Sequence, residues 1–376
     1  MCSNTRQTPR MAALQLGDAM DYRLDHLIPL CDLLDIPIIV DSSRVFALAQ
    51  KYYPPMKLIQ INSLEYFPYL CNFDLFFVSE KYMSRFLRAT FKLLFEKEIH
   101  FFYCPHGNSD KGFIDPCMNQ ETFHKLSLVY GEQMHRRIHT RNLCPELHSL
   151  VVMGNIRKRF YKKNQSFFDS IIKNTISLNS NIIKHVFLYA PSWRDTEDST
   201  SFFTICKSLL KHLSPSDYLI IKIHPLLRTH DLGYVTHIYE NYKCRKNIQF
   251  ITESPLIYPL LQHIDVYLGD ISSVGYDFLF FNRPMFFFDM RRNPPIESKQ
   301  LFECGIEVPP NYFKNPYPFI FSTLSENKAK ATIREKTYHF VFATDPPDDE
   351  LKQNILDSYH SCLLYTSPSP RDLSTS

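Results

Sequence analysis

The sequence predicts an α/β protein of two domains, each built on a doubly wound parallel sheet, that face each other across a central cleft. Short apolar runs alternate with segments of helical apolar spacing, and this alternation occurs twice, over residues 36–153 and again from residue 185. Several apolar runs are followed at once by His, Ser, Lys or Asp. Because open parallel sheets bind their ligands at the carboxyl ends of the strands, these polar residues predict a shared binding site.

Length and composition fit this architecture and exclude several classes of function. The chain has 376 residues, of which 44% are hydrophobic and 22% charged, as in a globular protein of two ordinary domains. Its nine glycines form no GxGxxG or GxxxxGK(S/T) loop, and a net charge of +3 is too weak to indicate nucleic-acid binding. The ten cysteines have no metal-ligand spacing, and we find no signal peptide and no membrane-spanning segment. We therefore expect a cytoplasmic protein with reduced thiols and no bound metal.

The first half of the chain predicts an alternating series that ends in a polar connection. The predicted strands are 36–41, 58–61, 73–79, 100–103, 126–130 and 150–153, and the predicted helices are 25–34, 45–51, 85–98 and 131–137. The helix over 85–98 carries Arg85, Arg88 and Lys92, which is compatible with contact to anionic lipid, although an ordinary packed helix is favoured. The polar stretch 158–164 and a helix over 167–178 lead to the second half.

The second half repeats the pattern and closes with helices. The predicted strands are 185–189, 218–223, 248–251, 264–269 and 285–288, and the predicted helices are 202–213, 256–262, 274–281, 324–336 and 349–360. Residues 294–318 are rich in proline and predict a surface loop. The predicted parts of the chain are a first domain (1–163), an inter-domain connection (164–184), a second domain (185–348), a closing helix (349–360) and a tail (361–376). We interpret this tail, whose composition differs sharply, as a non-native read-through.

The most informative stretch is a strand, a Ser-Ser turn, a helix and a strand over residues 263–289. Ser272 or Ser273 is a natural N-cap, because its hydroxyl can accept a hydrogen bond from a backbone N–H of the helix. Free N–H groups at a helix start form an anion site, and Asp270 and Asp277 flank this one. The alternative interpretation is a Ser-capped helix that binds nothing.

A histidine follows the strand predicted over 100–103. His106 lies at the carboxyl end of that strand, Gly107 allows the backbone to turn sharply, and Lys111 adds a cation nearby. A histidine at such a position can act as a general base near neutral pH, whereas the alternative is a solvent-exposed loop histidine. A second tight turn follows the strand over 150–153, where Gly154 precedes Arg157.

Two strands of the second half also end in polar groups. Ser192 and Arg194 follow the strand over 185–189, while Lys222 and His224 lie at the end of the strand over 218–223 and point the same way. Alone, Arg194 fits a surface arginine and His224 a packed imidazole. Together with the Ser-capped helix at a neighbouring strand end, they predict a clamp for a diphosphate.

These motifs, in this order, make the chain similar to a known family. It resembles the CDP-glycerol glycerophosphotransferases, teichoic-acid-polymerase-like enzymes of the GT-B fold, in which two Rossmann-like domains face a cleft. The resemblance covers residues 73–289, with Ile156 where the family has proline, and no motif aligns over 1–72. The matching residues are His106, Gly107 and Lys111; Gly154 and Arg157; Pro191, Ser192 and Arg194; Lys222, His224 and Pro225; and Asp270, Ser272, Ser273, Asp277, Arg283 and Pro284.

The resemblance implies a transferase that moves a glycerol-phosphate or related polyol-phosphate unit from a CDP-linked donor. The implied acceptor is a hydroxyl of a bacterial cell-envelope polymer, glycan or lipid-linked molecule, and CMP is released. We expect His106 to remove the acceptor proton, the second domain to hold the phosphates, and Asp277 to bind ribose or hold its helix in place. Catalytic roles are expected for His106 and His224, and donor binding for Lys111, Ser192, Arg194, Lys222, Asp270, Ser272, Ser273 and Asp277. We expect no cofactor, since no acidic metal motif is present, and no nucleic acid, since the net charge is low. Membrane attachment stays open: a lipid-linked acceptor would require peripheral contact with the cytoplasmic face of the membrane.

Three other functions stay open on the sequence alone. A GT-B glycosyltransferase that uses a nucleotide sugar for capsule or surface-glycan synthesis would have the same cleft and phosphate clamp. A nucleotide-sugar epimerase of the same fold would need an acidic pair near the sugar, and no clear pair is present. A non-catalytic binding module would have no need of His106 and His224.

Overall fold

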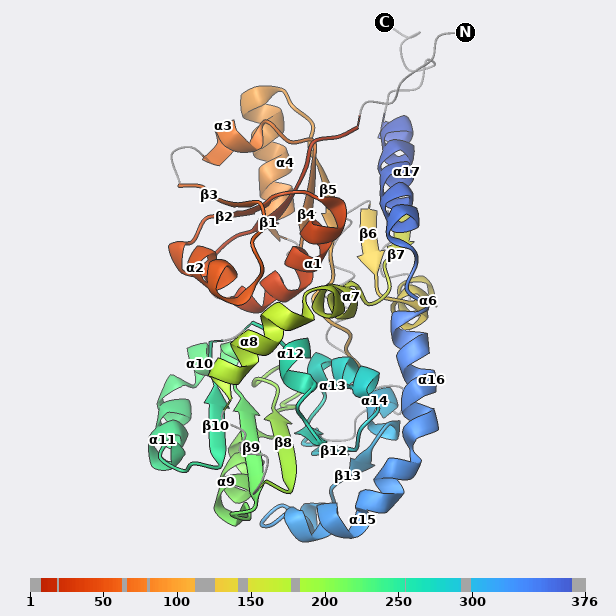
Figure 1. Ribbon diagram of the computed structural model, residues 1–376. Helices are drawn as coiled ribbons and strands as arrows, with labels where there is room; N and C mark the ends of the chain where they lie inside the picture. Colours follow the sequence, from red (N-terminus) through yellow and green to blue (C-terminus); the bar gives the residue numbers. More distant parts are fainter. Residues whose placement is uncertain are drawn as a thin grey trace, which may run out of the picture.

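The computed structural model describes residues 8–18, 20–62, 66–79, 82–111, 126–140, 148–176, 183–253, 255–291 and 299–366. Over these residues the chain forms two parallel sheets with helices on their faces, and the two resulting domains lie one above the other (Figure 1). The predicted pair of doubly wound α/β domains is confirmed.

The first domain contains a seven-stranded sheet in the order β3-β2-β1-β4-β5-β6-β7, and all neighbouring strands are parallel. The chain order reverses between β1 and β4, where open α/β sheets bind ligands. The strands are β1 (Met11–Gln15), β2 (Ile38–Val40), β3 (Leu58–Gln60), β4 (Leu75–Val78), β5 (His100–Tyr103), β6 (Leu126–Val129) and β7 (Ser149–Val152). The helices are η1 (Asp21–Arg23), α1 (Leu24–Leu34), α2 (Ser43–Tyr52), α3 (Tyr66–Leu70), α4 (Tyr82–Phe95) and α6 (Glu132–Thr140).

Two helices lie at the junction of the domains, α7 (Ile156–Lys163) and α8 (Gln165–Thr175) (Figure 1). The second domain contains a six-stranded parallel sheet in the order β10-β9-β8-β11-β12-β13. Its strands are β8 (His185–Ala190), β9 (Asp217–Lys222), β10 (Ile248–Ile251), β11 (Val266–Gly269), β12 (Met285–Phe287) and β13 (Ile306–Glu307). Its helices are α9 (Phe202–His212), α10 (Pro225–His230), α11 (Leu232–Tyr242), α12 (Tyr258–Leu261), α13 (Ser273–Phe278), η2 (Leu279–Phe281), α14 (Gln300–Glu303) and η4 (Pro310–Tyr312).

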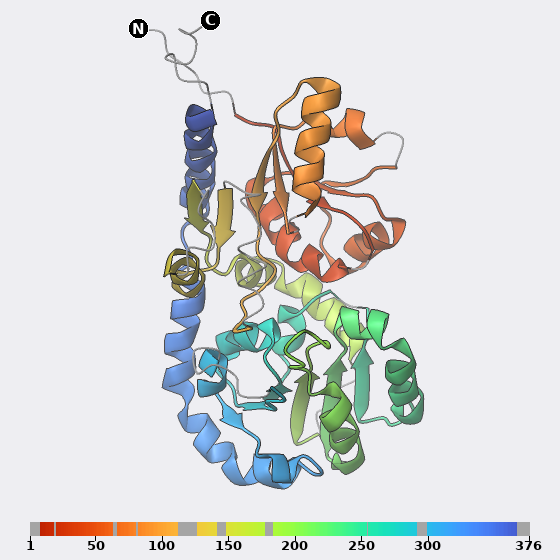
Figure 2. The same cartoon turned by 180° about the vertical axis from the view of Figure 1, so that it is seen from behind.

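Three C-terminal helices run along one side of both domains, α15 (Tyr317–Ala329), α16 (Ala331–Phe342) and α17 (Asp348–Thr366) (Figure 2). The last of them returns to the first domain, where Ser149 Oγ donates to Ser358 Oγ at 2.8 Å and the rings of His100 and Tyr359 lie 5.4 Å apart. The prediction of one helix over 324–336 was wrong, because the chain makes two helices separated at Lys330. Residues 367–376, which form most of the tail interpreted as a read-through, lie outside the described residues.

The largest difference from the sequence prediction is β1, which was not predicted and is central in the first sheet. Its sequence, MAALQ, contains no β-branched or aromatic residue, so its intrinsic strand preference is weak. The strand forms because β2 and β4 pair with it on both sides and four of its five residues are buried.

Other segments are more ordered than the sequence predicted. The polar stretch 158–164 lies largely in α7, where buried Ile156, Phe160 and Tyr161 pack on one side. Residues 294–318, predicted as a loop, contribute α14, β13 and η4, although residues 292–298 lie outside the described part. Helices α10 and α11 were also not predicted.

The strands of both sheets end towards the space between the domains. Residues that follow β1, β4 and β5 of the first sheet, and β8, β9 and β11 of the second, line one common cavity. Within the described residues, none of the helices combines the length and the apolar character needed to cross a bilayer.

The turn after β7 depends on glycine. Gly154 has φ of +66°, and a Cβ atom there would lie 2.8 Å from Asp345 Oδ1 and 3.0 Å from Asp345 Cα. The same carboxylate accepts a hydrogen bond from the backbone N of Asn155 at 2.8 Å. This confirms the predicted turn and shows that it brings the segment before α17 against the first domain.

We predict that Gly154→Ala lowers the free energy of unfolding by ~1–3 kcal/mol, because the left-handed backbone and the contact with Asp345 both oppose a Cβ. Gly233→Ala is the matched control: Gly233 lies in α11 with nothing within 4 Å of an added Cβ. This control is expected to gain ~0.5–1 kcal/mol, as alanine usually does in a helix. Thermal and urea unfolding of both variants would reveal the difference, and equal effects would contradict the assignment.

Candidate active site

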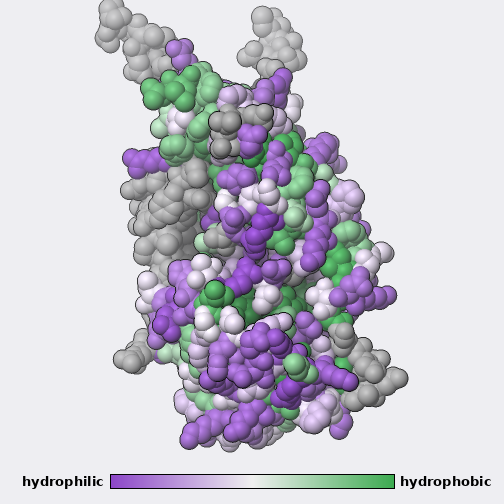
Figure 3. All heavy atoms as spheres, turned by 90° about the vertical axis from the view of Figure 1, so that its left-hand side faces the viewer, coloured by the Kyte–Doolittle hydropathy of each residue, from purple (hydrophilic) through white to green (hydrophobic). Residues whose placement is uncertain are grey.

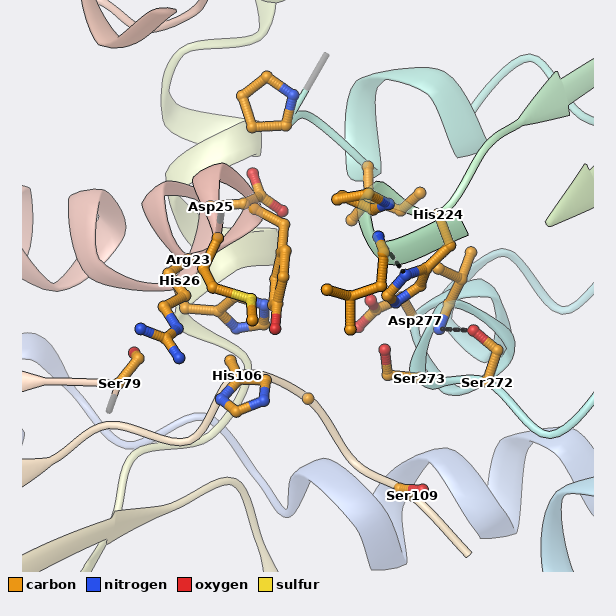
Figure 4. Close-up of a pocket in the computed structure, with 18 of the residues that line it drawn as sticks. Arg23, Asp25, His26, Ser79, His106, Ser109, His224, Ser272, Ser273 and Asp277 are labelled. Carbon is orange, nitrogen blue, oxygen red and sulfur yellow. Dashed lines mark hydrogen bonds between the residues drawn. The ribbon is translucent and has the colours of Figure 1, made fainter. Parts of the chain in front are cut away.

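A cavity of about 730 Å³ lies between the domains. Figure 4 shows Arg23, Asp25, His26 and Ser79 of the first domain on one side, and His224, Ser272, Ser273 and Asp277 of the second domain on the other. His106 lies beside the gap between these two groups (Figure 4). The cavity therefore has a wall from each domain, as predicted.

The loop after β5 crosses from the first domain to the second. Gly107 has φ of +130°, and a Cβ at this position would lie 2.6 Å from Ser273 Cβ. A side chain at residue 107 would therefore separate the two domains. This close contact brings His106 into the cavity that His224 and Ser273 also line, which is the juxtaposition the sequence predicted.

Lys111 anchors the same loop to the second domain. Its Nζ donates to Ser192 Oγ and to Asp195 Oδ2, the latter at 2.6 Å, and both side chains of the ion pair are buried. Burial opposes the charge on Asp195, yet Lys111 holds the pKa of this carboxyl below its usual value. Lys111 was predicted to bind donor phosphate; in this structure it joins the domains, although it still lines the cavity.

His224 is an uncharged hydrogen-bond donor rather than a cation. Its Nδ1 accepts a hydrogen bond from the backbone N of Leu226 at 3.1 Å and caps α10. Burial lowers the pKa of His224 to about 3, and Lys111 and Lys222 act in the same direction. A neutral imidazole that accepts at Nδ1 carries its proton on Nε2. His224 can therefore offer an N–H to a ligand throughout the physiological pH range.

Lys222 and two serines form the rest of the second-domain wall. Burial lowers the pKa of Lys222 to about 8, while the carboxylates of Asp25 and Asp21 oppose the shift, so most Lys222 side chains are protonated at neutral pH. Ser272 caps α13 by accepting from the backbone N of Val274 at 3.4 Å, as predicted, and Ser273 lies beside it (Figure 4). Together these groups supply one cation and two hydroxyls to an anionic ligand.

Two predicted donor-binding residues are not brought into the cavity. Arg194 has 58% of its side chain exposed, stacks on the ring of Phe203 at 4.4 Å and reaches Asp231 only at 4.0 Å. It points away because the turn after β8 directs residue 194 towards α9. The sequence placed it at the right strand end but could not fix the direction of its side chain.

Asp270 is fully buried and serves the backbone. Its carboxylate accepts hydrogen bonds from the backbone N of Ser192, at 2.8 and 3.0 Å, and from the backbone N of Ser201 at 2.9 Å. Burial raises the pKa of Asp270 to about 6, with Lys111 opposing the shift. The predicted phosphate-binding role is therefore corrected: Asp270 fixes the turn that positions Ser192.

Arg157 and Asp277 form a buried ion pair across the domain junction. The guanidinium of Arg157, on α7, donates to Asp277 on α13 and, at 3.4 Å, to Asp25 on α1. Tyr258 also donates to Asp277, at 3.2 Å. Asp277 reaches the cavity wall, but these contacts fit the second of its two predicted roles, which was to hold its helix in place.

The sequence missed an aromatic side chain that lies between the two site histidines. The ring of Tyr22, in η1, lies 5.6 Å from that of His106 and 6.2 Å from that of His224. Tyr22 belongs to the region 1–72, in which no motif was recognised. Had β1 been recognised, Tyr22 would have been placed after the carboxyl end of a central strand, where ligands bind.

A second missed residue, His26, supports the backbone next to His106. Tyr130 Oη donates to the carbonyl of Pro105 at 2.7 Å and lies 2.7 Å from His26 Nδ1. Since the hydroxyl has one proton, His26 Nδ1 is the donor in this second contact. Burial lowers the pKa of His26 well below its usual value, with Arg157 and His106 acting the same way, so the relay is uncharged.

The fold is of the GT-B type, with two Rossmann-like domains and a histidine, a lysine and hydroxyls around the cavity between them. Residues 132–297 match the model of the CDP-glycerol:poly(glycerophosphate) glycerophosphotransferase family. The resemblance inferred from the motifs agrees with this match over that part of the chain. No curated protein matches the chain.

Solved structures of similar fold share the two-domain architecture. The wall teichoic acid polymerase TagF has a TM-score of 0.63 at 15% identity, with 95% of this chain and 89% of that chain covered. HepE from Anabaena, in complex with UDP-glucose, has a TM-score of 0.54 at 11% identity over 94% of this chain and 100% of that chain. UDP-GlcNAc 2-epimerase from Neisseria meningitidis, bound to UDP-GlcNAc, has a TM-score of 0.56 at 12% identity, with 92% of this chain and 99% of that chain covered. These similarities confirm the GT-B fold.

We predict that Asp277→Ala costs ~3–5 kcal/mol of unfolding free energy, because it leaves the Arg157 guanidinium buried without its main partner. Arg194→Ala, which removes an exposed ion pair and the stacking on Phe203, is the control and is expected to cost less than about 1 kcal/mol. Calorimetry of thermal unfolding measures the loss of stability in both variants. A donor KM that rises in Asp277→Ala with no loss of stability would instead assign this carboxylate to donor binding.

Proposed function

We propose that the protein transfers a glycerol-phosphate or related polyol-phosphate unit from a CDP-linked donor to a hydroxyl of a cell-envelope polymer. The observation that carries this proposal is the single cavity shared by His106 of the first domain and by His224, Lys222 and Ser273 of the second. The family match over residues 132–297, which includes the whole phosphate-binding wall, supports the same reaction.

The reaction needs one proton acceptor and a means of stabilising charge on the phosphates. His106 takes the proton of the acceptor hydroxyl, whose oxygen attacks the distal phosphorus of the donor. The bond from this phosphorus to the bridging oxygen breaks, and CMP leaves with the electron pair. Lys222 Nζ, His224 Nε2–H and the hydroxyls of Ser272 and Ser273 stabilise the charge that develops on the phosphate oxygens. These protein groups take the place of a metal, so we expect EDTA to leave the rate unchanged.

The direct experiment incubates the purified protein with a polyol-phosphate acceptor and with CDP-glycerol, CDP-ribitol or UDP-glucose, and measures the nucleotide released. Release of CMP from a CDP-polyol supports the proposal. Acceptor-dependent release of UDP from UDP-glucose would show a nucleotide-sugar glycosyltransferase instead.

We predict that His106→Ala lowers the rate of CMP release by ~10²–10⁴-fold, because the acceptor oxygen loses its base. His339→Ala is the matched control, since His339 is exposed on α16 and does not line the cavity. Full activity of His106→Ala would remove the base assignment.

His224 offers a comparison within the same assay. His224→Asn can still cap α10 but has no donor at the Nε2 position, so its rate is expected to fall ~10²-fold with little change in stability. With a pKa near 3, His224 does not titrate above pH 5, so the variant should keep the shape of the wild-type pH profile there. A shift of the acidic side of the pH–rate profile in His224→Asn would contradict the neutral state assigned to His224.

We propose further that α4 brings the protein to the cytoplasmic face of the membrane, where lipid-linked acceptors are found. Phe86, Leu93 and Leu94 have 56%, 81% and 60% of their surface exposed, beside Arg85 and Lys92. The helix ends at the pole of the first domain away from the cleft (Figure 1), and hydrophobic surface gathers at that end of the molecule (Figure 3). Exposed apolar side chains with flanking cations fit an anionic lipid surface.

We predict that the wild-type protein cosediments with phosphatidylglycerol vesicles and that the double variant Leu93→Glu and Leu94→Glu does not, because the new carboxylates repel the lipid. Leu232→Glu changes a leucine that is 59% exposed on α11 of the second domain and serves as the control. Vesicles of phosphatidylcholine alone test the contribution of charge. Equal binding of the double variant and the control would exclude α4 as the contact.

A further inference from the structure

Asn108 is buried in the cavity wall without the hydrogen bonds that a buried amide needs. Only 3% of the residue is exposed. Neither its Oδ1 nor its Nδ2 has a hydrogen-bond partner among the described residues. Leaving both groups of a carboxamide unsatisfied is costly, and native proteins rarely do so without a functional reason.

The neighbours of Asn108 on the same loop are bonded or packed against the second domain. Gly107 packs against Ser273, and Lys111 binds Ser192 and Asp195. The carboxylate of Asp110 accepts from the Tyr276 hydroxyl and, at 2.9 Å, from the backbone N of Leu301. The loop is therefore fixed at both sides of Asn108, which keeps the residue in the wall of the cavity.

The chemistry of the missing partner follows from the amide itself. A carboxamide presents an acceptor at Oδ1 and donors at Nδ2, and both are uncharged. A phosphate would satisfy only the donors. A hydroxyl both donates and accepts, so a pair of neighbouring hydroxyls complements both ends of the amide.

The position of Asn108 indicates which part of the donor carries these hydroxyls. It adjoins Gly107, which touches Ser273 of the phosphate-binding wall, and it is two residues from His106. A group held there lies next to the phosphate under attack. We propose that Asn108 binds the hydroxyls of the polyol that is transferred, and thereby selects polyol-phosphate donors; this inference rests on the proposed function.

The test measures binding of two ligands, CDP-glycerol and CDP, by calorimetry with the wild type and Asn108→Leu. The variant has a side chain of similar size but no hydrogen-bonding groups. We expect it to weaken CDP-glycerol binding about tenfold or more, as the loss of one or two hydrogen bonds predicts, and CDP binding less than twofold. Equal weakening of both ligands, or of neither, overturns the inference.

Thermal unfolding without ligand separates this role from a structural one. Asn108→Leu should melt no lower than the wild type, because it removes two unsatisfied buried groups. Asn155→Leu is the matched control: Asn155 is fully buried but donates to Tyr258 at 2.6 Å and caps α7, so its loss should lower Tm by several degrees. A comparable loss in Asn108→Leu overturns the inference. If the wild type binds neither CDP-glycerol nor CDP, the proposed function fails. If the wild type binds both but Asn108→Leu does not discriminate between them, only the inference about Asn108 fails.

Discussion

The buried contact between Lys111 and Asp195 is the interaction on which the site depends. It joins a loop of the first sheet to a turn of the second with both charges out of water, at 2.6 Å. A buried ion pair adds little net stability but is costly to break, so its main effect is to fix geometry. Because Gly107 and His106 lie on the same loop, this pair helps to fix the position of the imidazole relative to Ser273, together with the hydrogen bonds of Asp110. Asp270 accepts a hydrogen bond from the backbone N of Ser192, and the Ser192 hydroxyl accepts one from Lys111, so Asp270 also fixes the position of this contact.

The Arg157–Asp277 pair fixes the same relationship from the other side of the cleft. It joins α7 to α13, and Asp25 adds a contact to α1, so three elements from two domains share one guanidinium. Burial raises the pKa of Asp25 to about 6, with Arg157 opposing the shift. Between about pH 4 and pH 6 an unfolded Asp25 releases its proton while the folded one keeps it, so the free energy of unfolding falls as the pH rises through this range. The cleft geometry is therefore maintained by charges that are costly to bury.

The sequence predicted the strand ends well and the side-chain directions poorly. His106, Lys222, His224, Ser272 and Ser273 reach the cavity because strand ends in parallel sheets share an edge, and this follows from the pattern alone. Arg194 and Asp270 lie at the correct strand ends, but their directions depend on a turn that no periodicity encodes. Strand β1 was missed because its residues prefer helix, and only pairing on both sides overrides that preference. Tyr22 was missed with it, since its position follows from β1.

The two walls of the cavity carry different groups, and on the proposed function this difference orients the substrates. The second-domain wall offers Lys222, an imidazole N–H and serine hydroxyls, which suit phosphate oxygens. The first-domain wall carries Arg23 and Asp25, and also the ring of Tyr22 and the His26–Tyr130 relay that holds the backbone before His106. On the proposed function, the diphosphate of the donor lies against the second domain, and the acceptor oxygen approaches from the side of His106.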